Sequence, residues 1–157
     1  MTDTPASDNT IHEVFPYLRQ RDCQAAIDFY REVFGAKETM RLAEPSGKIG
    51  HAELKFGNTT IMVADEYPDY GIHAPQPDQP AGCAIHLHVE DVDALTGRAA
   101  AAGAVILMEP RDQFYGERTS RLRDPFGHEW LLGHSIEEVS PEEMQRRFTE
   151  MCEGGST

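Results

Sequence analysis

The chain contains the same pattern of residues twice, in the same order. Three pairs of segments match each other: LRQRDCQAA (18–26) with LHVEDVDAL (87–95), FGAKETM (34–40) with AGAVILM (102–108), and KFGNTTIMV (55–63) with PFGHEWLLG (125–133). The separation between matching positions varies by no more than two residues, as two copies of one unit with small insertions would produce. The repeat therefore predicts two modules of the same topology.

Each copy begins with a short apolar strand that runs into an aspartate. Asp22 and Asp91 can cap the helices CQAAIDFYREVF and VDALTGRAAAA, and Gly35 and Gly103 follow them at positions that favour a left-handed backbone. Three extended segments come next: KETMRLAE, KIGHAELKF and TTIMVAD in the first copy, VILMEP, RTSRLRD and EWLLGH in the second. The order in each module is therefore predicted to be βαβββ, which makes the fold class α+β.

The segments outside the two copies complete the predicted organisation. Prolines make the connection between the copies stiff and irregular, and SPEE (140–143) is typical of a helix N-terminus. The predicted division is a disordered leader over 1–10, a first module over 11–66, a proline-rich linker over 67–82, a second module over 83–135 and a C-terminal helix over 136–153.

Charge and composition exclude several kinds of partner. The formal net charge is -13, so the surface should repel nucleic acids and anionic membranes. No stretch approaches the roughly 20 apolar residues that cross a bilayer, and the first ten residues lack the order of a signal peptide. Cys23, Cys83 and Cys152 are odd in number and far apart, which favours reduced thiols in the cytoplasm.

Several of these motifs occur together in one known superfamily. The helix AAIDFYREVFGA, the turn DPFGH and the two βαβββ units resemble the vicinal oxygen chelate superfamily, which includes glyoxalase I, extradiol dioxygenases, fosfomycin-resistance enzymes and bleomycin-resistance proteins. HAELKFGNTTIMVADE and QFYGERTSRLRDPFGHEW are similar to its PhnB-like branch. The resemblance covers about residues 11–135. It implies a mixed sheet curled into a cup, a ligand site on the concave face, and a homodimer.

The resemblance also indicates where a metal would be held. Metal enzymes of this superfamily usually take ligands from the first and last strands of each module. The matching positions here are Phe15, Ala84, Leu131 and Ile61, or Met62 if the register shifts by one. None of these side chains is a usual metal ligand, so the resemblance implies a cup without the usual metal and without a cofactor.

Strand alternation assigns further side chains to the cup. His86 and His88 share one face of AIHLHV, opposite the apolar Ile85, Leu87 and Val89. Two imidazoles at this spacing can reach one ion, and Glu129 or Glu53 could add a carboxylate. The alternative hypothesis is therefore one divalent metal ion held by His86, His88 and Glu129. The other interpretation is a polar pocket without metal.

Other candidates have similar pairs of interpretations. His51 beside Glu53 is a candidate general base or a solvated pair; Arg118 and Arg121 are a clamp for a carboxylate or phosphonate, or surface ion pairs. Tyr115 lies in a predicted loop at the cup mouth. Side chains two residues apart on a strand share a face, and by this alternation (the parity of a position) Trp130 lies on the core face. The predicted ligand-binding residues are Phe15, Tyr17, Arg19, His51, Glu53, His86, His88, Tyr115, Arg118, Arg121 and Glu129.

Three functions remain open at this point. The first is a small-molecule-binding protein of the glyoxalase and bleomycin-resistance type, homodimeric and without metal. The second is a lyase, isomerase or dioxygenase with a metal shifted to His86 and His88. The third is a structural or regulatory dimer module in which the C-terminal helix is the interacting element.

Overall fold

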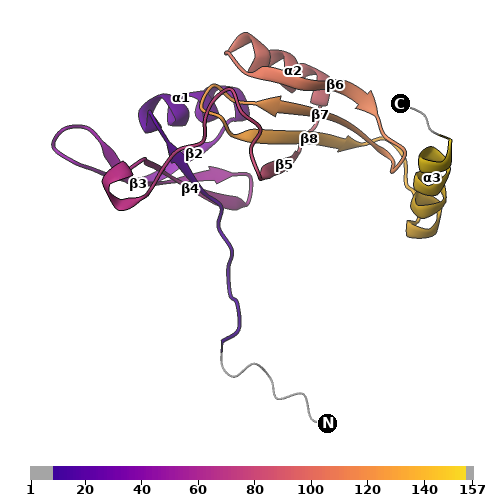
Figure 1. Ribbon diagram of the computed structural model, residues 1–157, viewed down its shortest axis with the longest axis horizontal. Helices are drawn as coiled ribbons and strands as arrows, with labels where there is room; N and C mark the ends of the chain where they lie inside the picture. Colours follow the sequence, from indigo (N-terminus) through magenta and orange to yellow (C-terminus); the bar gives the residue numbers. More distant parts are fainter. Residues whose placement is uncertain (1–8, 155–157) are drawn as a thin grey trace.

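The computed structural model describes residues 9–154, so most of the predicted leader, residues 1–8, lies outside the described part. Two βαβββ modules are followed by a separate C-terminal helix (Figure 1). The elements of the first module are β1 (Tyr17–Gln20), α1 (Cys23–Phe34), β2 (Lys37–Ala43), β3 (Ile49–Phe56) and β4 (Thr59–Asp65). After the short 3-10 helix η1 (Pro68–Tyr70) come β5 (Ala84–His88), α2 (Val92–Ala101), β6 (Val105–Asp112), β7 (Glu117–Arg123), β8 (Glu129–Ser135) and α3 (Pro141–Glu153).

The two modules have the same strand order, which confirms the repeat. The first sheet has the order β1-β4-β3-β2 and the second has the order β5-β8-β7-β6. In both sheets the opening strand is parallel to the closing strand, and the other neighbours are antiparallel. The α+β fold with two modules and a C-terminal helix is therefore confirmed, and each module forms its own four-stranded mixed sheet.

Local capping signals fixed the helix boundaries. Asp22 accepts a hydrogen bond from the Ala25 N–H at 3.1 Å, and Gly35 ends α1 with φ of 69°. The second helix stops one residue earlier than its glycine suggested, with Ala102 as its C-cap. At α3, Ser140 accepts from the Glu143 N–H at 3.2 Å.

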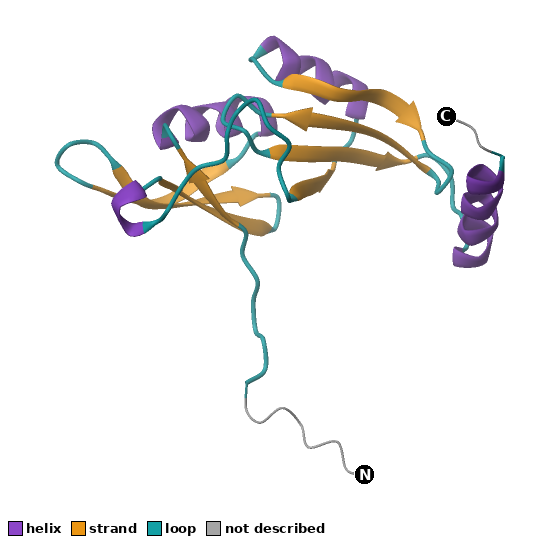
Figure 2. Cartoon of the chain, in the orientation of Figure 1, coloured by secondary structure: helices purple, strands orange, loops and turns teal. Residues whose placement is uncertain are grey.

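The apolar faces of both sheets and the helices α1 and α2 share one hydrophobic core. Both helices lie on the same side of the sheets in Figure 2. Trp130 is 1% exposed, as its parity predicted, and stacks on Phe56 with ring centroids 5.5 Å apart. Ile85, Leu87 and Val89 also pack against this core. Residues of the first module therefore complete the core of the second.

A buried carboxylate joins the two modules. Asp124, 2% exposed, lies in the turn before β8 and accepts a hydrogen bond from the Tyr30 hydroxyl of α1 at 2.5 Å. It also accepts from the Trp130 indole N–H at 2.9 Å and from the backbone N–H groups of Phe126 and His128. Burial, and then the charge of Asp124, raise the pKa of Tyr30 well above its usual value, so the phenol keeps the proton that it donates.

Two segments extend away from this body. Residues 9–16 run outward before β1, and α3 stands at the far end of the second sheet (Figure 1). Within the described chain, α3 packs against no other helix or strand. It touches the β6–β7 turn: the ring centroids of Phe148 on α3 and Phe114 in the turn are 5.6 Å apart. None of the described helices combines the length and apolar character that a bilayer crossing requires.

Candidate functional site

The open face of the first sheet carries a line of three polar side chains. Tyr17 on β1 and His51 and Glu53 on β3 have the parity opposite to the buried Leu18, Ala52 and Leu54. The Tyr17 hydroxyl lies 2.7 Å from His51 Nδ1, and His51 Nε2 lies 2.9 Å from Glu53 Oε2. Sequence alternation therefore placed these residues correctly on one face.

Hydrogen-bond chemistry assigns the protons in this line. A carboxylate oxygen accepts, so the His51 tautomer that satisfies both contacts carries its hydrogen on Nε2 and accepts from the Tyr17 hydroxyl at Nδ1. Partial burial is the largest cause that raises the pKa of Tyr17, so at neutral pH the phenol has a proton to donate. The carboxylate of Glu53 is thus occupied by His51, as in the paired interpretation of these two residues.

A cavity of about 560 Å³ lies between the two modules, bounded by β1, the start of β5 and the linker. Its apolar lining comes from Leu18, Ile85 and prolines, and Tyr17 and Arg19 contribute polar atoms from β1. The full lining is Pro16, Tyr17, Leu18, Arg19, His73, Ala74, Pro75, Gln76, Gln79, Pro80, Ala81, Gly82, Cys83, Ile85, His128 and Glu129. Cavities of this size and mixed character are the usual sites for small organic ligands.

Two contacts hold the linker over this cavity. Arg21 donates to Gln76 Oε1 at 2.8 Å, and the backbone N–H of Ala81 donates to Glu129 Oε2 at 2.7 Å. Glu129 is 8% exposed and also has Arg121 at 3.8 Å and Arg123 at 3.5 Å. Glu129 therefore faces inward, as parity predicted, and its carboxylate holds the wall of the cavity.

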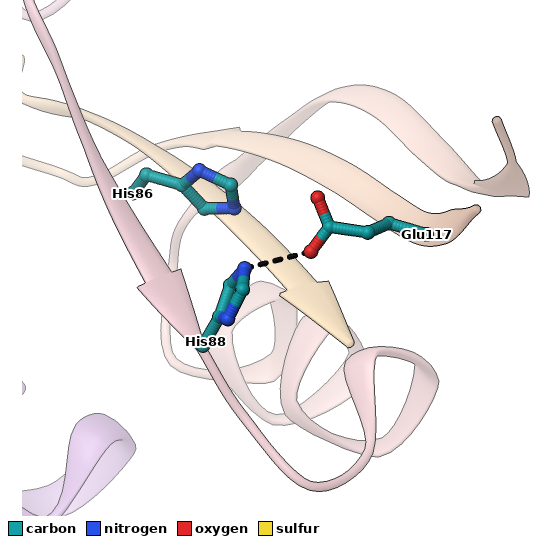
Figure 3. Close-up of side chains that lie close together, drawn as sticks. All are labelled: His86, His88 and Glu117. Carbon is teal, nitrogen blue, oxygen red and sulfur yellow. Dashed lines mark ion pairs between the residues drawn. The ribbon is translucent and has the colours of Figure 1, made fainter. Parts of the chain in front are cut away.

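The open face of the second sheet brings together two histidines and a glutamate. His86 and His88 on β5 lie with Glu117 of β7, and one ligand atom from each falls within 4.8 Å of the others (Figure 3). The predicted carboxylate partner was Glu129, but Glu129 pairs in register with Ala84, at the other end of β5. Glu117 shares the parity of Arg121, so alternation along ERTSRLR was a signal that could have found it.

The other predicted residues are dispersed. Arg118 lies on the side of α2, where it pairs with Asp93 at 2.7 Å and with Asp112 at 2.9 Å, so it does not reach the cavity from the strand entrance. Tyr115 lines a groove beside His88 and Glu117 rather than the cavity between the modules. Phe15 precedes β1 and is 39% exposed. The predicted residues thus lie in several separate places: the open faces of the two sheets, the cavity between the modules and the side of α2.

The four positions where the superfamily usually holds its metal do not fit an ion here. Met62, not Ile61, lies on the open face, because Ile61 is 1% exposed in the core and Met62 pairs in register with Tyr17. Met62, Phe15, Ala84 and Leu131 together offer one thioether and no nitrogen or oxygen ligand. The second sheet's histidines lie further along β5 than the usual position.

Comparison with known families agrees with this architecture. The model of the Glyoxalase/Bleomycin resistance protein/Dioxygenase superfamily matches residues 10–132. The chain belongs to this superfamily. The match spans both modules and ends within β8, so the C-terminal helix lies outside it.

Relatives of known sequence cover most of the chain. It is 39% identical over 142 residues to the uncharacterized protein Rv0887c of Mycobacterium tuberculosis, an alignment that covers 88% of this chain and 84% of that one. It is also 31% identical over 117 residues to the anthracycline biosynthesis protein DnrV of Streptomyces peucetius. That second alignment covers 70% of this chain and 42% of DnrV.

Solved structures show the same fold. TioX from Micromonospora sp. ML1 is 27% identical with a TM-score of 0.59, and the alignment covers 82% of this chain and 100% of TioX. The fosfomycin resistance protein FosX of Listeria monocytogenes, solved with Mn(II) and sulfate, has a TM-score of 0.61 at 18% identity and covers 88% of this chain and 98% of FosX. At that identity the likeness concerns the fold alone.

Proposed function

We propose that this protein binds a small organic ligand in the cavity between its two modules, without the metal that the superfamily usually holds. The observation that carries the proposal is the cavity of about 560 Å³, which both modules and the linker line. Its walls combine proline and aliphatic carbon with a few polar groups, the composition that orients small molecules. Arg19 offers a guanidinium to an anionic group of the ligand.

The comparisons are consistent with a ligand of this kind. The relative DnrV is named as an anthracycline biosynthesis protein, and an anthracycline is a small organic molecule. Tyr17, which extends from β1 beside Arg19, supplies an aromatic face for a planar ligand. The four hydrocarbon and thioether side chains at the usual metal positions support the part of the proposal that concerns the metal.

The proposal extends to three broader properties of the protein. Assignment to the PhnB-like branch is supported by the stretches HAELKFGNTTIMVADE and QFYGERTSRLRDPFGHEW. A cytoplasmic location is supported by the number and spacing of the cysteines. A homodimer is supported by the apolar side chains Phe148 and Met151 on α3, which are 46% and 43% exposed.

A fluorescent probe tests the cavity. The dye 8-anilinonaphthalene-1-sulfonate carries apolar rings and one anionic group, so saturable binding to the folded protein is expected, with one dye per chain. Gly82 lines the cavity, and a Cβ there meets nothing within 4 Å, so the backbone can carry a side chain at this position. Gly82→Phe should therefore occupy part of the site and weaken dye binding at least about tenfold. Arg19→Ala should weaken it as well.

A matched substitution controls for added aromatic surface. Gly97, on the exposed surface of α2, also has open space around a Cβ, so Gly97→Phe should leave dye affinity unchanged. Equal affinities for wild type and Gly82→Phe would rule out the cavity as the binding site. Native mass spectrometry of freshly purified protein then searches for the natural ligand, which Gly82→Phe should no longer retain.

A further inference from the structure

The three side chains on the second sheet converge because of the strand order. His86 and His88 come from β5 and Glu117 comes from β7, and β8 lies between these strands. Strands separated by one neighbour are about 10 Å apart, so side chains on them meet only if both lean over the strand between. Figure 3 shows the three side chains pointing toward one another from the two sides.

A glycine on β8 makes this convergence possible. Gly133 pairs in register with His88 on one side and with Thr119 on the other. A Cβ at Gly133 would lie 2.9 Å from His86 Nε2 and 3.3 Å from Glu117 Oε1, closer than atoms of these kinds normally approach. Any side chain there would occupy the space into which the ligand atoms of His86 and Glu117 project.

The carboxylate in this cluster has an unsatisfied oxygen. Glu117 Oε1 lies 2.7 Å from His88 Nε2, which is an ion-pair distance. The same oxygen is buried, and apart from this ion-pair contact it has no hydrogen-bond partner among the described residues. A buried carboxylate oxygen without a donor is costly, and a cation beside it would satisfy it.

We propose that His86, His88 and Glu117 form a binding site for one divalent transition-metal ion of the zinc type. Two imidazole nitrogens and one carboxylate oxygen are a ligand set that Zn²⁺ takes in three-ligand sites, with a water at the fourth position. The ring centroids of the two histidines are 5.0 Å apart. One nitrogen of each ring lies within 4.8 Å of the other and of a Glu117 oxygen, so small side-chain rotations can bring all three to one ion.

The site opens to a groove on the surface. His88 and Glu117 line this groove together with Tyr115, Ser135 and residues 137–140. The side chain of His88 is 66% exposed and that of Glu117 is 18% exposed, so an ion would have one face toward the carboxylate and the other toward water. This site is separate from the cavity of the proposed function, and neither proposal depends on the other.

The experiment titrates protein purified without a histidine tag with Zn²⁺ in a calorimeter, and with Co²⁺ followed by visible absorption. We expect one ion per chain and a tetrahedral Co²⁺ spectrum. Loss of a residue that only supports a metal ligand typically lowers metal affinity about 10–100-fold. His86 and Glu117 are proposed as ligands themselves, so His86→Ala and Glu117→Gln should each lower Zn²⁺ affinity at least about tenfold. Gly133→Ala should weaken binding in the same way while all three ligands remain.

The first sheet supplies the matched control. His51 and Glu53 form a histidine–carboxylate pair 2.9 Å apart, and no third His, Cys, Asp or Glu of the described residues joins them in a metal-type cluster. His51→Ala and Glu53→Gln should leave the Zn²⁺ affinity and the Co²⁺ spectrum unchanged. Circular dichroism of Glu117→Gln, which preserves side-chain size, confirms that the variant is folded. Absence of binding by the wild type, or equal affinity in Glu117→Gln, would overturn the proposal.

Discussion

At the scale of single residues, this protein shows which side chains alternation can place and which it cannot. Alternation put Tyr17, His51 and Glu53 on one face, because parity along a strand is a local property. It did not reveal that Glu117 meets His88, because that contact depends on β8 lying between β5 and β7. Strand order is decided by packing across the whole module, so parity alone does not distinguish Glu117 from Glu129 as the partner of the histidines.

The buried Asp124 should be among the most sensitive positions in the chain. Asp124→Ala leaves the Tyr30 hydroxyl, the Trp130 indole N–H and two backbone N–H groups without their acceptor. We expect a loss of about 3 kcal/mol or more in the free energy of unfolding, measured by urea denaturation. Asp28→Ala, which removes an exposed acceptor of a Gln24 hydrogen bond, should change stability by less than about 0.5 kcal/mol. Similar values for both would contradict this role of Asp124.

The three thiols should differ sharply in reactivity. Burial, and then the neighbouring charge of Asp65, raise the pKa of Cys23 to about 12, so the thiolate is scarce at pH 8. Cys83 and Cys152 are exposed. A thiol-specific label followed by mass spectrometry should therefore modify Cys83 and Cys152 in the folded protein, and all three cysteines after denaturation. Rapid labelling of Cys23 under native conditions would show that this environment is incorrectly described.

At the scale of elements, signals close in sequence were sufficient for the helices. The limits of α1 agree with the predicted segment because its cap, Asp22, and its end, Gly35, act within one turn. The start of β1 differs from the predicted strand because Pro16 has no N–H to donate, and β1 begins at the next residue. The twelve residues of α1 could thus be assigned from the chain alone, whereas the pairing of its Tyr30 with Asp124 could not.

Two glycines predict opposite effects of one substitution. Gly35 has φ of 69°, so Gly35→Ala places a Cβ in a left-handed conformation and should destabilise the protein by about 1 kcal/mol. Gly97 is inside α2 with an ordinary helical backbone and open space, so Gly97→Ala should stabilise it by about 0.5–1 kcal/mol. Urea midpoints of the two variants compare these effects directly. Shifts of the same sign would contradict the assigned backbone conformations.

At the scale of the whole molecule, the two-module body and α3 are distinct units. The body has a continuous core, in which Trp130 of one module packs on Phe34 and Phe56 of the other. The helix α3 has no buried residue. Its contacts with the β6–β7 turn are a hydrogen bond of 2.9 Å from Arg147 to the Phe114 carbonyl and the ring contact between Phe148 and Phe114. Stability should therefore reside in the body, and α3 is available for association.

Removal of residues 140–157 tests this division. The truncated chain should unfold cooperatively, with a free energy within about 1 kcal/mol of the full chain when both are measured at low concentration, because α3 contributes few apolar contacts. If α3 holds the proposed homodimer together, sedimentation equilibrium should show a dimer for the full chain and a monomer for the truncated one. A truncated chain that stays dimeric would place the interface on the body instead.

The matched strand order of the two modules has an evolutionary consequence. Two copies of one backbone frame carry different side chains: Tyr17, His51 and Glu53 on the first sheet, and His86, His88 and Glu117 around Gly133 on the second. Because the two modules share one backbone frame, mutations can change the polar side chains on the open face of one sheet while those on the other sheet stay the same. One chain of this fold can therefore carry two sites of different chemistry.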